Sequence, residues 1–467
     1  MDPQSAEVPM TPLAHRLLRL PGRGTATAYA QTLLESLGAR VVPEPGPADP
    51  DPALANARSG LPALTGLPGG PPQMCPAPLA SCADGVIRAL HCIAAPAGDG
   101  VLPEGAALLG ERAAIAGLRR NGATSPGGSC RLLRARDGWF ALSLTRADDW
   151  ELLPAWLETD DAGSWTAVAA QVAGRAATEL VDRARLVGLA AAVSGFPAET
   201  PWYTITARGH GAPTGAHRAA PRVLDLTSLW AGPLCTQLLR ALGARVVKVE
   251  SINRPDGARH GPAPFFDLMN AGKLSVAVDF GGDLRLLHAL LACADIVVES
   301  SRPRALRQLG VLAEEWLAAR PGRTWLSING YGRDEPGANF IAYGDDAGVA
   351  GGLSTLLLEV TGQPLFCGDA IADPLAGLHA ALATWSSFQG GGGHLLSVAL
   401  SDVVAHCARF TLPASAGELR ARWQRWTAIS HDAGPDTVLP LARTATGAAR
   451  PLGADNGNAV SGWDDGG

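Results

Sequence analysis

The chain has 467 residues and a formal net charge of −6, and 47% of its residues are hydrophobic. This length predicts two or three domains, and the apolar content excludes a disordered chain, which combines low hydrophobicity with high net charge. There is no basic tract, so the charge pattern of a nucleic-acid-binding protein is missing. No apolar run approaches the roughly 18 residues of a membrane-spanning helix.

The cysteines and the N-terminal sequence predict a cytoplasmic protein. The eight cysteines form no CxxC pair and no cluster near histidines, so we expect neither a metal site nor a disulfide framework. The first ten residues, MDPQSAEVPM, carry acids where a secretory signal carries basic and then apolar residues. Both features suit a reducing compartment.

Two proline-rich stretches and an internal repeat organise the chain. Residues 43–53 predict a turn, and residues 196–221 predict a linker between two halves, since proline removes backbone donors. The repeated segments are 33–44 with 238–250, and 57–90 with 348–382. Two matches in the same order indicate a tandem in which each copy has lost a different part. The tail from about His431 has little core-forming capacity, and we expect it to fray.

The second half alternates short β-branched runs with helical segments. Strands are predicted at 222–227, 244–250, 274–280 and 295–300, a strand followed by a loop at 324–332, and helices at 235–243, 284–294 and 305–311. This alternation predicts an α/β fold with a doubly wound, mainly parallel sheet. A ligand is then expected at the carboxyl ends of the strands.

Four segments carry a family resemblance: VLDLTSLWAGPLCTQLLRALGARVVKVE, FDLMNAGKLSVAVDF, ADIVVESSRPRALRQLGV and AIADPLAGLHAAL. They resemble the family III CoA-transferases, which include formyl-CoA transferase, carnitine CoA-transferase and the α-methylacyl-CoA racemases. The resemblance covers residues 222–400, and residues 131–158 are similar to the strand-turn-strand part of the family's small domain. It implies a CoA-binding large domain with a smaller α+β domain.

The resemblance and the repeat together predict the domain organisation. The expected units are a truncated first copy of the large domain at 25–105, the small domain at 106–195, the linker at 196–221, the CoA-binding large domain at 222–400, and a C-terminal segment with its tail at 401–467. Two chains of a usual family member interlock as rings. Because this chain contains parts of two copies, we expect a monomer or a homodimer.

Asp373, in AIADPLAG, stands where the resemblance places the catalytic nucleophile. A carboxylate can attack an acyl-CoA thioester to give a mixed anhydride and then an aspartyl-CoA thioester. The alternative is a helix N-cap, because Asp before a proline at the start of a helix is a favoured arrangement. Asp84 is expected to be the counterpart of Asp373 in the first copy, where we expect it to cap a helix.

Further residues match positions that contact CoA in the family. They are Leu229, Trp230, Asn270, Lys273, Ser300, Arg302, Asn329, Gly330 and Tyr331. Lys273 is expected either to pair with a phosphate or to be a solvated turn lysine. Two arginines common in the family are replaced by Ser251 and Gln308.

Other features favour plainer interpretations. The glycine run 390–394 lacks the Lys-Ser/Thr ending of a phosphate loop, so a turn before a strand is expected. Family racemases use a histidine–aspartate pair, but this chain has Asp345 and Asp346 near that histidine's place. His379 lies six residues after Asp373, on another side of the helix, and is expected to be partly buried.

The sequence therefore predicts an enzyme that transfers CoA from an acyl-CoA to a carboxylic acid acceptor. No cofactor is expected beyond CoA as a substrate, and no metal, nucleic-acid partner or membrane partner is expected. The alternatives are an acyl-CoA racemase or isomerase on the same fold, and a non-catalytic CoA-binding relic.

Overall fold

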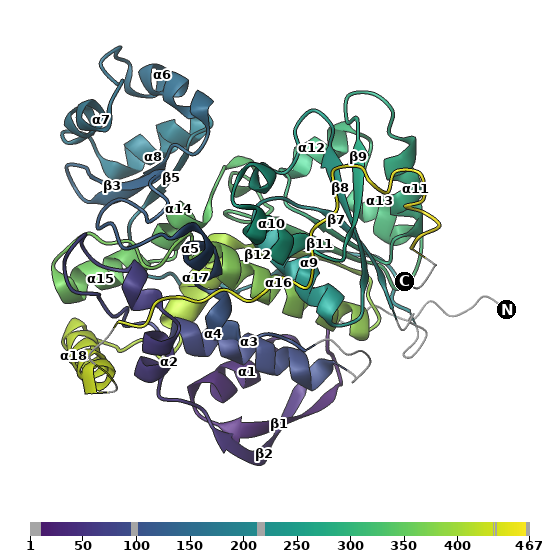
Figure 1. Ribbon diagram of the computed structural model, residues 1–467, viewed down its shortest axis with the longest axis horizontal. Coiled ribbons are helices and arrows are strands. Elements are labelled where there is room, and N and C mark those ends of the chain that lie inside the picture. The colour runs from purple at the N-terminus through teal and green to yellow at the C-terminus, as the bar shows by residue number, and fades with distance from the viewer. Residues whose placement is uncertain (1–10, 95–100, 213–219, 433, 435–436, 464–467) are drawn as a thin grey trace.

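A computed structural model describes residues 11–94, 101–212, 220–432, 434 and 437–463 (Figure 1). The first ten residues, which the sequence distinguishes from a secretory signal, and residues 213–219 of the expected linker lie outside the described part. Within the described part, no helix is long and apolar enough to cross a membrane.

The molecule is built around a seven-stranded sheet with the order β6-β12-β11-β10-β7-β8-β9. The strands are β6 (Thr204–Arg208), β7 (Arg222–Leu226), β8 (Arg245–Ser251), β9 (Leu274–Val278), β10 (Ile296–Glu299), β11 (Thr324–Asn329) and β12 (His394–Ala399). All neighbours are parallel except β6, which pairs antiparallel with β12. The chain winds outward from β7 and then from β10, which confirms the predicted doubly wound sheet. Ligands of such sheets bind where the order reverses, here at the carboxyl ends of β7 and β10.

Helices cover both faces of this sheet, because its central strands are apolar on both sides. β10 and β12 are buried along their whole length. One face packs on α9 and α16, and the other packs on α11 and α13. The helices of this half are α9 (Ala231–Ala241), α10 (Ala263–Asn270), α11 (Arg285–Cys293), α12 (Pro303–Gln308), α13 (Ala313–Ala318), α14 (Gly344–Ala350), α15 (Leu353–Thr361), α16 (Ala372–Gln389) and α17 (Leu400–Arg409).

A smaller α+β unit stands apart from the sheet, at the upper left of Figure 1. Its antiparallel strands are β3 (Cys130–Arg134), β4 (Trp139–Ser143) and β5 (Ala190–Val193). Its helices are α6 (Leu153–Leu157), α7 (Trp165–Val172) and α8 (Ala177–Leu186). Phe140 and Trp156 are fully buried in its own hydrophobic core. These elements lie within residues 106–195, the range predicted for the smaller domain.

The N-terminal unit repeats part of the large one. It contains β1 (Leu17–Arg23), α1 (Thr25–Ser36), β2 (Arg40–Ala48), α2 (Pro52–Arg58) and α3 (Leu79–Ile93), followed by α4 (Gly105–Leu108) and α5 (Glu111–Ala116). β1 pairs parallel with β2, as β7 pairs with β8. In the same way, α1 packs on α3 as α9 packs on α16.

Matching residues show how the two copies align. The corresponding pairs Gly60 and Gly352, Cys75 and Cys367, and Gly85 and Gly377 are each 292 positions apart. The same spacing relates α2 to α14. A Cβ at Gly85 would lie 2.7 Å from the carbonyl oxygen of Ala26, and a Cβ at Gly377 would lie 2.6 Å from that of Ala231. Both glycines therefore permit the same close helix contact, at the first turn of α1 and of α9.

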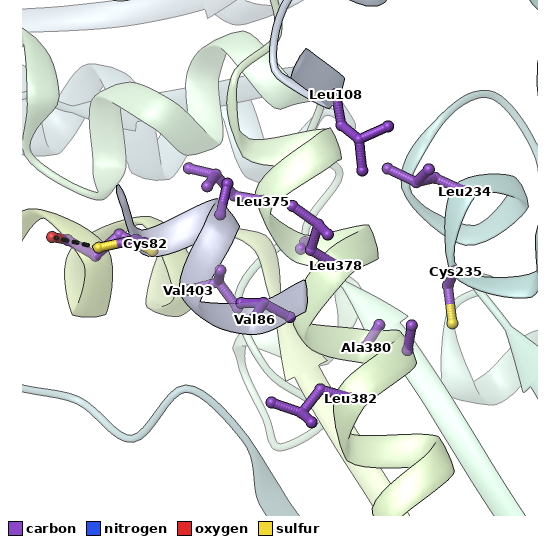
Figure 2. Close-up of a cluster of buried hydrophobic side chains, with 14 of the residues drawn as sticks. Cys82, Val86, Leu108, Leu234, Cys235, Leu375, Leu378, Ala380, Leu382 and Val403 are labelled. Atoms are coloured by element: carbon purple, nitrogen blue, oxygen red, sulfur yellow. Dashed lines mark hydrogen bonds between the residues drawn. The ribbon is translucent and has the colours of Figure 1, made fainter. Parts of the chain in front are cut away.

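The two copies share one hydrophobic core. α3 packs against α16 and α17, and Figure 2 shows Val86 of α3 close to Val403 of α17. The thiol of Cys82 lies 3.9 Å from the carbonyl oxygen of Cys407. The N-terminal unit is thus packed directly against the helices of the large sheet.

The C-terminal segment is ordered, so the expectation of a frayed tail is wrong for residues 437–463. After α18 (Ala416–Asp432), the chain crosses the molecule to the outer strand β9, as the yellow trace in Figure 1 shows. The amide group of Asn456 hydrogen-bonds both the N–H and the carbonyl of Ala277, which satisfies this edge of the sheet. Trp463 is 1% exposed, and its indole N–H donates to the carbonyl of Arg245.

Candidate active site

The loop after β7 is held by a buried polar network. Leu229 has a φ of 69°, a left-handed conformation that leucine rarely adopts. The carboxylate of Asp256 accepts a hydrogen bond from the Leu229 amide at 2.9 Å and pairs with Nζ of Lys248 at 2.9 Å. Lys248 also donates to the carbonyl of Thr227 at 2.8 Å. This network leaves the Leu229 side chain 43% exposed at the carboxyl end of β7.

Lys273 is buried, contrary to the expectation of a solvated turn lysine. Its Nζ donates to Asp225 at 3.0 Å, to the Thr236 hydroxyl at 2.7 Å and to Asn270 Oδ1 at 3.1 Å. An ammonium group has three N–H bonds, so these partners occupy all of them. The geometry therefore leaves Lys273 no donor for a phosphate, and Asn270 is likewise occupied. Through these hydrogen bonds, Lys273 links β7 to α9, and Asn270 is bonded to Lys273.

Trp230, the residue before α9, is 2% exposed. Its ring packs edge-on against Phe265 at 5.5 Å, and the Arg112 guanidinium lies 5.8 Å from its centroid. The indole N–H has no hydrogen-bond partner among the described residues. A buried donor without an acceptor is costly, so a ligand acceptor at this point would stabilise the site.

Arginine side chains gather at the carboxyl ends of β8 and β10. Arg302 follows β10, is exposed, and makes no side-chain hydrogen bond with a described residue. Partial burial, and then the like charges of Arg304, Arg146 and Arg254, lower its pKa. Ser300 lies exposed beside it. Like charges held this close favour an anionic ligand between them.

Arg254 was not predicted as a site residue. It lies three positions after Ser251, which replaces an arginine common in the family, and its charge still reaches Arg302. The loop after β8 therefore supplies a positive charge three residues later than the family's arginine. A position-by-position comparison of the sequences does not reveal this.

The loop after β11 carries three of the predicted CoA residues. Asn329 is hydrogen-bonded through both atoms of its amide to β12 and to its own loop. A Cβ at Gly330 would collide with Ala342, so glycine is required there. The Tyr331 hydroxyl donates to Asp346 at 3.0 Å. Of the three, Tyr331 contacts the acidic residues described next.

Four carboxylates lie at the beginnings of α14 and α16: Asp345, Asp346, Asp369 and Asp373. Asp345 accepts the Ala370 amide at 2.8 Å, and Asp346 accepts the Ser143 hydroxyl at 3.0 Å. Burial raises the pKa of Asp345 to about 6 and that of Asp346 to about 7. In the described part of the chain, no group of three or more His, Cys, Asp or Glu side chains is arranged to hold a metal ion.

Asp373 lies at the carboxyl edge of the sheet, because α16 runs antiparallel to the strand β12 that follows it. It is the second residue of α16, and Ile371 is the cap, so the N-cap interpretation is wrong. Its carboxylate accepts no hydrogen bond from any described residue. A Cβ at Gly344 would collide with Oδ2 of Asp373, so glycine lets the carboxylate rest against α14. Burial raises the pKa of Asp373 to about 7, although the charge of Arg112 lowers it.

Arg112 is a second residue that the sequence did not single out. It comes from α5, in the N-terminal part of the chain, and forms a two-pronged ion pair with Asp369 at 2.8 and 2.5 Å. Asp369 is completely buried, whereas about a third of the Arg112 side chain is exposed. The positive charge that lowers the pKa of the candidate nucleophile thus comes from a segment outside the recognised motifs.

The N-terminal copy lacks this acidic group. The 292-position spacing places Ala53, Leu54, Ala77 and Ser81 at the positions of the four carboxylates. Asp84 was expected to be the counterpart of Asp373, but Ser81 takes that place, four positions before the packing glycine as Asp373 is. Asp84 accepts the Ala106 amide at 2.8 Å. It therefore caps a helix, as expected, although the helix is α4.

The N-terminal copy also differs at the position that corresponds to Arg254, one of the arginines expected to bind an anionic ligand. The LGARVV motifs of the two copies are 205 positions apart, and this spacing aligns Asp49 with Arg254. Asp49 accepts the Thr27 amide in the first turn of α1 at 2.7 Å and pairs with Arg88 at 2.6 Å. An internal carboxylate thus occupies the helix N-terminus, where an anionic ligand would otherwise bind.

Two other predicted features lie outside the site. His379 is completely buried, with Nε2 2.8 Å from the Tyr29 hydroxyl and Nδ1 2.7 Å from the Leu375 carbonyl oxygen. The glycine run forms a turn with Gly392 at a φ of 67°, and β12 begins at His394. The expected turn before a strand is confirmed.

Comparison with known sequences shows which family the second half of the chain is similar to. Residues 220–428 match the family described as CoA-transferase family III. Formyl-CoA:oxalate CoA-transferase from Escherichia coli O6:H1 is 28% identical over 204 residues, which cover 41% of this chain and 49% of that protein. The enzyme of that name from Shigella boydii serotype 18 matches equally well. The chain spans about half the length of the curated relatives it matches. Residues 220–428 are therefore similar to the family III CoA-transferases.

Solved structures with similar sequences include Rv3272 from Mycobacterium tuberculosis and a CAIB/BAIF family protein from Brucella suis. The first is 28% identical, with a TM-score of 0.37 over 40% of this chain and 56% of that one. The second is 27% identical, with a TM-score of 0.36 over 52% of this chain and 61% of that one. With TM-scores this low, neither structure adds to the description of this chain.

Proposed function

We propose that the protein transfers CoA from an acyl-CoA to a carboxylic acid, with Asp373 as the nucleophile. The observation that carries this proposal is the placement of Asp373. It is the one carboxylate of the acidic group that accepts no hydrogen bond from a described residue, and it lies at the sheet edge where arginines gather. The match of residues 220–428 to family III supports the same chemistry.

The reaction needs only a carboxylate and the two substrates. The Asp373 carboxylate attacks the thioester carbonyl, the C–S bond breaks, and a mixed anhydride and CoA thiolate result. The thiolate attacks the aspartyl carbonyl, which gives an aspartyl-CoA thioester and releases the donor acid. The acceptor carboxylate then attacks this thioester, and the thiolate returns to the new acyl group. Each bond that breaks is replaced, so Asp373 is regenerated.

The proposed position of CoA follows from the charges. Its phosphates would lie between Arg302, Arg304 and Arg254, because guanidinium groups bind phosphate in a two-pronged manner. The chain beyond the phosphates would pass Leu229 and Trp230, where an indole N–H lacks an acceptor. Lys273 has no part in this proposal, because its donors are occupied.

The racemase alternative is less well supported by the same residues. His379 is buried against Tyr29, and the carboxylate of Asp346 is tied by the Ser143 and Tyr331 hydroxyls. Neither is placed as a base that exchanges protons with a substrate beside Asp373. The non-catalytic alternative suits the N-terminal copy, which lacks the carboxylates, better than it suits the C-terminal one.

Incubating the protein with an acyl-CoA and a panel of carboxylic acids tests the proposal. We expect new CoA esters, formed only when both substrates are present. Exchange of deuterium into the α-carbon of the acyl group without an acceptor acid would instead indicate a racemase. CoA binding with neither reaction would indicate a non-catalytic protein.

A further inference from the structure

We propose that Arg112 is a positioning residue for the nucleophile: through Asp369 it fixes the segment before α16, and its charge favours the carboxylate form of Asp373. This inference rests on the proposed function. It adds a role for the N-terminal part of the chain, which would supply the cation that the catalytic half lacks at this point.

The contacts of Arg112 are directional. Nε donates to Oδ2 of Asp369 at 2.8 Å and Nη2 donates to Oδ1 at 2.5 Å, so both carboxylate oxygens are held in one plane. A Cβ at Gly127 would lie 3.2 Å from Nη2 of Arg112 and 3.7 Å from Oδ1 of Asp369. The glycine loop that leads into β3 therefore lies directly against this pair.

α5 is held in place from its other side. Glu111, next to Arg112 in sequence, is completely buried and pairs with Arg443 at 2.5 Å. A Cβ at Gly110 would lie 2.5 Å from Cβ of Pro440. The C-terminal segment thus clamps α5, so Arg112 projects from a fixed helix rather than from a free loop.

Asp373 needs a cation because carboxylates surround it. The charges of Asp345 and Asp346, in α14, and of Asp369, before α16, all raise the pKa of Asp373. Arg112, from α5, is the group whose charge opposes these three and favours ionisation of Asp373. A carboxylic acid is a poor nucleophile compared with its carboxylate, so the charge of Arg112 bears directly on the proposed step.

Two variants that break the same ion pair separate this role from a structural one. Arg112→Gln removes the positive charge, so the pKa of Asp373 should rise. Asp369→Asn removes a negative charge and leaves Arg112 in place, so the pKa of Asp373 should fall. A purely structural brace predicts that both variants act alike, because both lose the same pair. Arg443→Gln is the matched control, since it breaks an ion pair with Glu111 of α5 but removes a charge that is not among those shifting the pKa of Asp373.

The measurement is the pH dependence of kcat/KM for CoA transfer. We expect the acidic limb to move to higher pH by about one unit in Arg112→Gln, the size of effect that a nearby opposite charge has. The limb should move to lower pH in Asp369→Asn and stay in place in Arg443→Gln, and Arg112→Lys should restore most of the shift. KM for the acyl-CoA should change little.

Shifts in the same direction for Arg112→Gln and Asp369→Asn, or no shift in either, would overturn the inference. If Arg112→Gln does not fold, Asp369→Asn and Arg112→Lys decide the question: the acidic limb should move to lower pH in Asp369→Asn and stay nearly in place in Arg112→Lys, and an unmoved or raised limb in Asp369→Asn would overturn the inference. The proposed function fails separately, because it requires Asp373→Asn to be inactive. If Asp373→Asn is inactive and the pH profile of Arg112→Gln is unchanged, the proposed role of Arg112 is wrong and the proposed function still stands.

Discussion

Ser81 occupies in the N-terminal copy the position that Asp373 occupies in the C-terminal copy. Each residue lies four positions before a glycine, Gly85 or Gly377, that packs on the carbonyl of the first turn of a helix. One copy therefore presents a hydroxyl where the other presents the candidate nucleophile. In the described part of the chain, the group of four aspartates is present in the C-terminal copy and absent from the N-terminal copy.

Each chain should bind one CoA molecule. In the N-terminal copy, Asp49 stands at the position of Arg254 and already fills the anion position at α1. Isothermal titration of the purified protein with CoA should give a stoichiometry of one. Two equivalent sites per chain would contradict the interpretation of Asp49 as an internal occupant.

Removing the arginines at the sheet edge should weaken binding without impairing the chemical step. In Arg254→Gln and Arg302→Gln, we expect KM for the acyl-CoA to rise about tenfold each, because a charge-assisted hydrogen bond contributes about 1.5–3 kcal/mol. The value of kcat should change little. Arg285→Gln is the control, since Arg285 is an exposed arginine at the start of α11 that pairs with Asp283. Equal effects in all three variants would indicate a general loss of positive charge.

Lys273→Gln should unfold easily rather than bind CoA poorly. The substitution leaves the carboxylate of Asp225 buried without its ion-pair partner, which costs about 3–5 kcal/mol. Urea unfolding should show the loss as a lower midpoint, while CoA affinity of the folded fraction stays close to that of the original protein. A normal midpoint with much weaker CoA binding would restore the phosphate role for Lys273.

Stability should fall as pH rises through neutrality. The folded pKa of Asp346 is about 7, and its unfolded value is about 3.9, so the folded state binds more protons between these values. The stabilisation is complete below pH about 4 and is lost as pH rises through about 7. Asp346→Asn cannot ionise. It should be more stable than the original protein at about pH 8, by on the order of 1 kcal/mol, with a flatter dependence on pH.

Urea unfolding midpoints at about pH 5.5 and about pH 8 test this prediction. Asparagine can still accept the Ser143 hydroxyl and the Tyr343 amide through its single carbonyl oxygen, which occupies the place of Oδ1. A variant that is less stable than the original protein at both values would show that the hydrogen bonds of the carboxylate outweigh the cost of burying its charge.

The sheet could be predicted because each of its strands has a recognisable local sequence pattern. Runs such as those of β7, β8 and β10 are short, apolar and separated by helical segments, and this pattern depends little on distant residues. The loops that bear Leu229, Arg302 and Tyr331 follow directly from the strand ends. The strand order therefore brought most of the candidate site into one region.

The rest depended on contacts between distant segments. A turn position such as that of Lys273 predicts an exposed side chain. Its burial beside Asp225 results from the packing of β7 against α9, which the local sequence does not show. Arg112 lies outside every motif, and the match of Asp84 to Asp373 ignored the glycine contacts that set the alignment of the helices. The tail seemed poor in core residues, yet Trp463 and a few amide groups are enough to hold it on β9.

The central claim is that Asp373 becomes covalently attached during transfer. The most direct measurement is mass spectrometry of the protein after incubation with an acyl-CoA and trapping with hydroxylamine. We predict a modified peptide bearing Asp373, an unmodified peptide bearing Asp84, and no modification in Asp373→Asn, which should still bind CoA. Full transferase activity in Asp373→Asn, or trapping at another residue, would contradict the account.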